Sequence, residues 1–146
     1  MRKHREKKYG GFTILEIMAV VIIIGTLAGI VAFNVFGKVE DAKKRATKAS
    51  LKVLDDAVTL FKLDTGRFPT EEEGLKALVE KPTDVTTWAE GGYLKTKTVP
   101  KDAWGNEFIY HLNPESGQPF EVMSYGADGQ EGGEGKDADL RSTDAD

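Results

Sequence analysis

Carboxylates and glycines are concentrated near the C-terminal end of the chain, in the segment YGADGQEGGEGKDAD (residues 125–139). Asp128 precedes a glycine at a sharp turn, and Asp137 and Asp139 add two more carboxylates later in the segment. Calcium takes roughly six to eight oxygen ligands from carboxylates, main-chain carbonyls and water. The segment offers that chemistry, although it is not an EF-hand and it resembles a calcium-binding nonapeptide repeat only in a single imperfect copy. An acidic, glycine-rich tail is also typical of disorder, so the residues alone leave both interpretations open.

A single carboxylate, Glu16, interrupts a run of 22 otherwise uncharged residues from Phe12 to Phe33. A carboxylate inside a bilayer costs roughly 2.5–3.5 kcal/mol at the centre and less near an end, so Glu16 needs compensation. If the chain were cut between Gly11 and Phe12, the new α-amine would lie one helical turn from Glu16, and a staggered neighbouring chain could present its own amine instead. Glu16 would then set the axial register between subunits. The alternative is a polar residue tolerated near the membrane interface.

No catalytic apparatus is visible in the sequence. The two histidines are far apart, His4 in a basic leader and His111 in a predicted strand, and cysteine is absent. The chain therefore has no histidine pair or thiolate for a metal, no disulfide framework and no nucleophile beside a base, and we expect it not to be an enzyme. One basic cluster is expected to be a solvated or subunit-pairing helix face rather than a nucleic-acid site; its members are Lys43, Lys44, Arg45 and Lys48.

The apolar run predicts a membrane helix, because it is long enough to cross a bilayer and too long for a cleavable secretory signal. Residues 1–11 carry five basic side chains against Glu6, a net charge of +4, and the positive-inside rule keeps this leader in the cytoplasm. We therefore predict three parts: a basic cytoplasmic leader (1–11), a hydrophobic transmembrane helix (12–36), and a domain across the membrane (37–146), periplasmic in a Gram-negative host, that includes the amphipathic half of the helix.

The apolar periodicity continues from residue 38 to residue 64, which predicts one helix of about 50 residues that stops at Gly66. The inner stripe of its second half is expected to comprise Val39, Ala42, Ala46, Ala49, Val53, Ala57, Leu60 and Phe61.

The remaining elements are short. Residues 70–81 are predicted to form a second helix that begins with a capping box between Thr70 and Glu73. Residues 106–112 and 119–125 alternate in polarity and predict two strands of an antiparallel hairpin. The fold class is therefore α+β.

The segment GGFTILE (residues 10–16), which follows a short basic leader, resembles the class III signal of type IV pilins and pseudopilins, with the two central aliphatic residues exchanged. The resemblance implies that a prepilin peptidase cuts after Gly11 and methylates the new amine of Phe12. It also implies that Glu16 serves subunit recognition. Gly25 and Gly29 form a G-x-x-x-G that lets helices approach closely, but glycine-containing stretches of this helix can also unwind in related filaments.

The rest of the chain resembles the major pseudopilins of type II secretion systems, in four blocks of the same order and spacing: TGRFPTEEEGLKALVEKP, GGYLK, VPKDAWGNEFIY and SYGADGQEGGEGKDADL. The resemblance covers nearly the whole chain, and ordinary type IV pilins usually end in a cysteine loop that is absent here. Two features depart from the family pattern. Ala103 replaces a common proline before Trp104, and the usual Asn-Trp after the final Asp-Ile is absent, with Leu140 and Arg141 standing there instead.

The resemblance implies a type IV pilin-like fold, in which a long N-terminal helix packs on a small domain with a short helix, a small antiparallel sheet and a C-terminal calcium loop. Alignment with the family assigns the calcium ligands to the side chains of Asp128 and Asp139 and the carbonyls of Tyr125 and Gln130, with Asp137 as the alternative to Asp139.

The same resemblance implies a single-pass inner-membrane precursor that polymerises into a periplasmic fibre. Its expected partners are further copies of the chain, minor pseudopilins, a prepilin peptidase, an inner-membrane assembly platform and an outer-membrane secretin, through which folded proteins leave the cell. Two alternatives are a type IV pilin of a surface fibre and a bitopic ligand-binding membrane protein whose leader stays intact.

Overall fold

The structure is a computed structural model that describes residues 11–144, with 32–36 described as helical backbone only. The predicted leader therefore lies outside the described residues, apart from Gly11. Two compact units are present, residues 1–39 and 40–146, and each is considered by itself. A helix, α1 (Ile14–Thr65), contributes to both units, and its 52 residues confirm the predicted continuous helix.

Helix α1 ends where the sequence predicts. Gly66 adopts a φ of +83°, in the left-handed region that glycine enters without steric cost, and its N–H donates to the Lys62 carbonyl at 2.8 Å. The Thr65 hydroxyl donates to the Phe61 carbonyl at 2.8 Å. The Gly66 bond satisfies one of the four carbonyls that the end of a helix leaves without an intrahelical partner.

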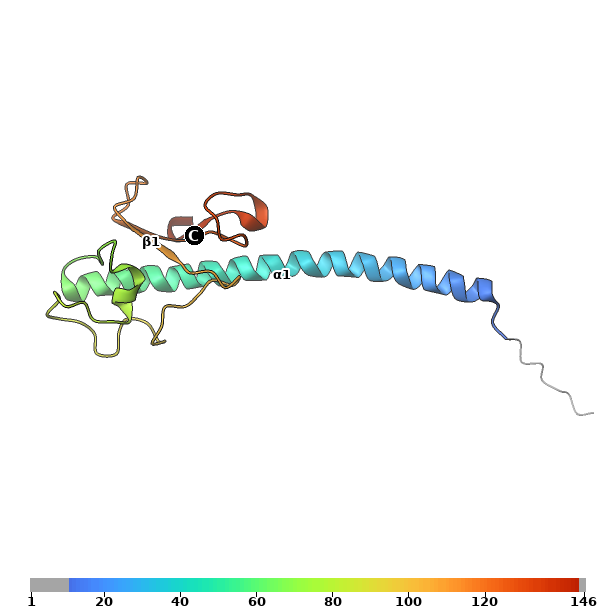
Figure 1. The fold of residues 1–146 in the computed structure, drawn as a ribbon, viewed down its shortest axis with the longest axis horizontal. Helices are drawn as coiled ribbons and strands as arrows, with labels where there is room; N and C mark the ends of the chain where they lie inside the picture. Colours follow the sequence, from blue (N-terminus) through green and yellow to red (C-terminus); the bar gives the residue numbers. More distant parts are fainter. Residues whose placement is uncertain (1–10, 145–146) are drawn as a thin grey trace, which may run out of the picture. The chain divides into compact units, whose positions relative to one another are not determined.

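In the second unit, α1 is followed by a short 3-10 helix and a three-stranded antiparallel sheet (Figure 1). The 3-10 helix is η1 (Gly74–Leu78), and the strands are β1 (Ile109–Leu112), β2 (Phe120–Ser124) and β3 (Leu140–Arg141), in the spatial order β1-β2-β3. The pairing of Tyr110 with Val122 sets the register of the predicted hairpin, and Met123 pairs with Arg141 of the third strand, which the sequence analysis did not predict. Two single-turn 3-10 helices, η2 (Gly135–Asp137) and η3 (Ser142–Asp144), belong to the C-terminal segment.

The predicted second helix is present, but it is shorter than residues 70–81 and has 3-10 geometry, as η1 (Gly74–Leu78). The capping box is present, because the Thr70 N–H donates to Glu73 at 2.8 Å and the Glu73 N–H donates to the Thr70 hydroxyl at 3.2 Å. Gly74 then takes a positive φ of +52°, which an α-helix does not accommodate, and the chain continues as the 3-10 helix η1. Leu75 and Leu78 still point inward and are buried.

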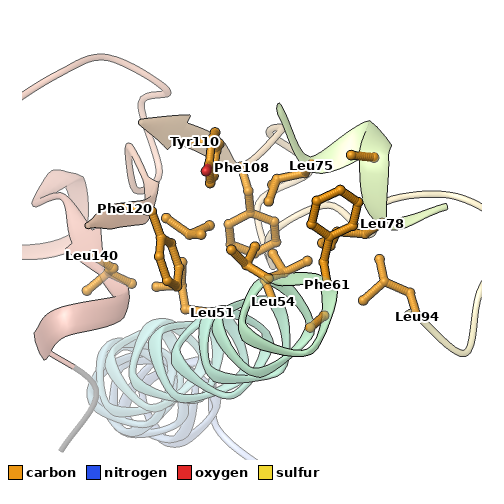
Figure 2. Packing of buried hydrophobic residues seen from close by; sticks show 14 of the residues in the cluster. Leu51, Leu54, Phe61, Leu75, Leu78, Leu94, Phe108, Tyr110, Phe120 and Leu140 are labelled. Carbon is orange, nitrogen blue, oxygen red and sulfur yellow. The ribbon is translucent and has the colours of Figure 1, made fainter. Parts of the chain in front are cut away.

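The core of the second unit lies between α1, η1 and the sheet (Figure 2). Leu51, Leu54 and Phe61 of α1 face residues from the other elements. These core partners are Leu75, Leu78, Phe108, Tyr110, Phe120, Val122 and Leu140.

The predicted inner stripe of α1 is largely wrong. Ala57 and Phe61 are buried as expected, but Val53 is 57% exposed and Leu60 is 51% exposed. Val39 and the three alanines at 42, 46 and 49 are exposed as well. The face that enters the core carries larger side chains with the same helical spacing, namely Thr47, Leu51, Leu54, Val58 and Phe61. A small domain buries the face that supplies most volume, and the alanine-rich stripe remains outside the core.

The outer edge of the sheet is covered locally by a side chain from the segment before η1. Glu71 accepts hydrogen bonds from the Leu112 N–H at 2.7 Å and lies 2.8 Å from Nδ1 of His111. The Leu112 bond is the largest cause of a lowered pKa of Glu71. Because β1 is an edge strand, this carboxylate takes up a main-chain N–H that no neighbouring strand reaches.

Candidate functional sites

The first candidate site is the beginning of α1. Residues Ile14–Val31 are long and apolar enough to cross a membrane, and none of this window is buried. Phe12 is 83% exposed, and a Cβ added at Gly11 would meet no atom within 4 Å. Gly25 and Gly29 are equally open on the surface of the helix. The predicted processing and assembly residues are thus all accessible in the single chain.

Glu16 is bound within its own chain. Its Oε2 accepts hydrogen bonds from the Thr13 N–H at 2.8 Å and from the Thr13 hydroxyl at 3.1 Å, while the Glu16 N–H donates to the Thr13 hydroxyl at 3.2 Å. This is a capping box, which satisfies two amides at the start of the helix. Thr13 was not among the predicted functional residues, although the T-x-x-E spacing of a capping box is present in the sequence.

The second candidate site is the C-terminal loop, residues 125–139. Asp139 turns back toward the middle of the loop, where both carboxylate oxygens accept the Gly132 N–H at 3.1 and 3.0 Å. Asp128 accepts the N–H of Gln130 at 3.1 Å. Asp137 lies 3.9 Å from the ammonium of Lys136. The structure therefore turns Asp139, rather than Asp137, back onto the loop.

Glycines allow the loop to fold tightly on itself. A Cβ added at Gly133 would lie 2.4 Å from the Asp137 carbonyl oxygen, and one at Gly126 would lie 2.9 Å from the Ala138 carbonyl oxygen. Both glycines also have positive φ angles. These contacts bring main-chain oxygens from the end of the loop close to its start.

A largely buried polar network holds Gly126, the second residue of the loop. Asp102 accepts the Ser124 hydroxyl at 2.7 Å and the Asn106 N–H at 2.8 Å. The Ser124 hydroxyl accepts the Gly126 N–H at 3.2 Å, and the Asn106 amide donates to the Gly126 carbonyl at 2.9 Å. This network was not predicted from the sequence, because Asp102 and Ser124 lie 22 positions apart along the chain.

The loop fits calcium by the chemistry of its donors, since it presents carboxylates and main-chain carbonyls without nitrogen or sulfur ligands. Within residues 11–144, no three histidine, aspartate or glutamate side chains are grouped as candidate metal ligands. A calcium site here would therefore depend on carbonyl oxygens as much as on the two aspartates, as the assignment of Tyr125 and Gln130 requires.

Part of the basic cluster contacts the C-terminal segment. The ammonium of Lys44 donates to the Gly135 carbonyl, and that of Lys48 donates to the Asp144 carbonyl at 3.1 Å. Lys43 instead lies 3.8 Å from Glu40. The expectation of a wholly solvated or subunit-pairing face is thus corrected for Lys44 and Lys48, because the acidic segment folds back onto this part of α1.

Comparisons with known proteins agree with this architecture. The family described as "Type II secretion system (T2SS), protein G" matches residues 34–143. The chain is 44% identical over 142 residues to the type II secretion system core protein G of Vibrio cholerae, covering 96% of this chain and 94% of that protein. It is 41% identical over 143 residues to the core protein G of Pseudomonas aeruginosa, covering 96% of this chain and 99% of the relative.

A solved structure supports the same assignment. The crystal structure of the major pseudopilin from the type 2 secretion system of enterohaemorrhagic Escherichia coli matches with a TM-score of 0.61 and 28% identity, covering 74% of this chain and 92% of that one. By sequence and by fold, the chain belongs to the protein G family of type II secretion systems, the major pseudopilins.

Proposed function

We propose that the chain is the structural subunit of a type II secretion pseudopilus, which polymerises into a periplasmic fibre and drives folded proteins through the outer membrane. The observation that carries this proposal is the unburied apolar segment Ile14–Val31 on a chain of this family. Lipid covers such a segment in the membrane, and the same segments of neighbouring subunits would cover it in a fibre. Because apolar surface is shielded in both states, extraction into the fibre has to be driven by an assembly machine.

Membership of the family supports the proposed partners. They are other copies of the chain, minor pseudopilins, the inner-membrane assembly platform and the outer-membrane secretin, and the role is structural rather than enzymatic. The positively charged leader supports a single-pass topology with the N-terminus in the cytoplasm and the body in the periplasm.

Processing is proposed to occur between Gly11 and Phe12, with methylation of the new amine by the prepilin peptidase. The accessibility of both residues supports this step. The test is intact mass and N-terminal sequencing of the protein from membranes of a host that expresses its prepilin peptidase, with Gly11→Val as the blocked control. A wild-type chain that begins at N-methylated Phe12 supports the proposal. A wild-type chain that keeps its leader identifies a permanent anchor and refutes it.

Calcium is proposed as the ion of the C-terminal loop. The side chains of Asp128 and Asp139 and the carbonyls of Tyr125 and Gln130 would hold it. The bound ion would offset repulsion among the acidic side chains and fix a loop that has no disulfide.

A further inference from the structure

Two lysines of α1 fasten the C-terminal segment to the helix. Lys44 donates to the carbonyl of Gly135, and Lys48 donates to the carbonyl of Asp144 at 3.1 Å. Because the two lysines are four residues apart, they lie on the same face of α1. The C-terminal segment is thus held at two points by cationic side chains.

Lys44 and Lys48 bond to the C-terminal segment, whereas neighbouring basic residues of α1 do not bond to any of its described residues. Lys44 and Lys48 are half-buried, whereas their neighbours Arg45 and Lys52 are exposed and make no hydrogen bond or ion pair with the described residues. Residues 126–146 carry seven acidic side chains against Lys136 and Arg141. The lysines therefore bring positive charge to a strongly acidic segment, but they bond to its carbonyls and leave its carboxylates available.

Lys44 contacts the C-terminal loop at Gly135, four residues before the candidate calcium ligand Asp139. Gly135 is the first residue of η2, and Asp137 is the last. Gly133 packs against the Asp137 carbonyl, and the candidate ligand Asp139 follows two residues later. An ammonium bonded to Gly135 is thus a monovalent cation attached to the same loop that is proposed to bind the divalent one.

We infer that Lys44 is a positioning residue for this loop, which holds the loop against α1 when the metal is absent and opposes the binding of calcium. The second part of this inference depends on the proposed calcium site, and the first part does not. The ammonium supplies a charge-assisted hydrogen bond that needs no metal. Its positive charge also repels an incoming divalent ion, so the site fills at a higher calcium concentration than the oxygen ligands alone would require.

The first experiment measures hydrogen exchange of the full chain in detergent micelles with a chelator present. Three amides report on the loop, because Ala127 donates to the Lys136 carbonyl, Asp137 to the Glu134 carbonyl, and Gly132 to Asp139. Lys44→Met keeps the aliphatic stem and removes the ammonium, and we expect these amides to exchange about fivefold faster or more. Lys44→Arg, which keeps the charge and the donors, should restore protection, and Arg45→Met should match the wild type. Unchanged exchange in Lys44→Met would overturn the positioning role.

The second experiment titrates calcium chloride into the same four proteins by calorimetry. We expect Lys44→Met to bind calcium about three- to tenfold more tightly than the wild type, while Lys44→Arg and Arg45→Met stay close to it. If Lys44→Met binds calcium as tightly as the wild type or more weakly, the inference that Lys44 opposes calcium binding is overturned. If none of the proteins binds calcium, the proposed metal site and this opposition both fail, whereas the exchange data still decide whether Lys44 holds the loop.

Discussion

The carboxylate of Glu16 and the hydroxyl of Thr13 bind each other's main-chain amides at the first turn of α1. In the single chain, therefore, the one acidic side chain of the apolar segment already has hydrogen-bond partners. A role in subunit register requires Glu16 to exchange these partners for the amine of a neighbouring chain. Capping and register make different demands on the side chain, since a cap needs an acceptor oxygen and an ion pair needs a charge.

Two substitutions separate these demands. Glu16→Gln keeps an oxygen that can complete a capping box but removes the charge, whereas Thr13→Ala removes the cap and leaves the charge. If Glu16 sets register, fibre yield after assembly should fall strongly in Glu16→Gln and less in Thr13→Ala, with membrane insertion of both variants unchanged. The measurement is the amount of fibre that can be sheared from the cells, divided by the amount of subunit inserted in the membrane. Normal fibre yield from Glu16→Gln would refute the register argument and leave Glu16 as a cap alone.

The two apolar faces of α1 differ in their contribution to stability. Leu54→Ala should lower the free energy of unfolding by about 2–5 kcal/mol, because the side chain is fully buried and its removal leaves a cavity. Leu60→Ala is the matched control and should change stability by less than about 0.5 kcal/mol, since Leu60 is half exposed. Urea unfolding followed by tryptophan fluorescence checks both values. Equal losses in the two variants would contradict the assignment of the core face.

The exposed stripe of α1 is expected to matter in the fibre instead. Val53→Lys should leave the urea midpoint unchanged but reduce fibre yield, because a charge would be placed on an apolar surface that assembly can cover. Thr59→Lys, at another exposed position of α1, serves as the control for added charge. Wild-type fibre yield from Val53→Lys would show that this stripe stays in solvent.

Acid should weaken the ion pair between Arg67 and Glu73. The guanidinium donates two hydrogen bonds of 2.8 Å to Glu73, and these lower the pKa of that carboxyl from 4.5 to about 2. Because the pKa is lower in the folded state, the stabilisation is complete above pH 4.5 and is lost as the pH falls toward 2. Glu73→Gln should therefore cost about 1–2 kcal/mol at pH 7, after allowance for partial exposure, and much less near pH 2. A pH-independent difference in unfolding free energy between wild type and variant would argue against this ion pair.

Calcium removal should loosen the C-terminal loop. Proteolysis within residues 126–139 should be slow in calcium and fast in chelator for the wild type, and fast in both for Asp128→Ala. Asp139→Asn should resemble Asp128→Ala, whereas Asp137→Asn should resemble the wild type, because Asp139 rather than Asp137 turns back onto the loop. Identical proteolysis of the wild type in calcium and in chelator would exclude the metal site.

Local sequence signals predicted the elements of this fold that depend on neighbouring residues. The stop at Gly66, the capping box at Thr70 and the hairpin between β1 and β2 are all encoded within a few positions. The core face of α1 was not predictable in this way, because the helix carries two apolar stripes with similar spacing. The choice between Leu54 and Val53 depends on which stripe fits the aromatic residues of the sheet, and those lie more than 50 residues away.

The candidate calcium loop also combines features that have a local sequence signal with features that have none. Its donors, Asp128 and Asp139, are evident from composition, whereas the bond between Asp102 and Ser124 that anchors its root joins residues 22 positions apart. Strand β3 is two residues long, and its pairing with Met123 and Ser124 depends on the path of the loop before it. The lysine contacts of α1 with Gly135 and Asp144 span 91 and 96 residues and carry no local signal.

The hydrogen bond from Leu112 to Glu71 affects how the edge of the sheet can pair with other chains where subunits are crowded. Subunits of a fibre are close together, and an open sheet edge is a template for amyloid-like pairing with another chain. Glu71 occupies an outward N–H of β1 and adds a negative charge beside it. A foreign strand would have to displace that bond and bury the charge. Glu71 thus blocks one pairing position at this edge of the sheet with a carboxylate rather than with an additional strand.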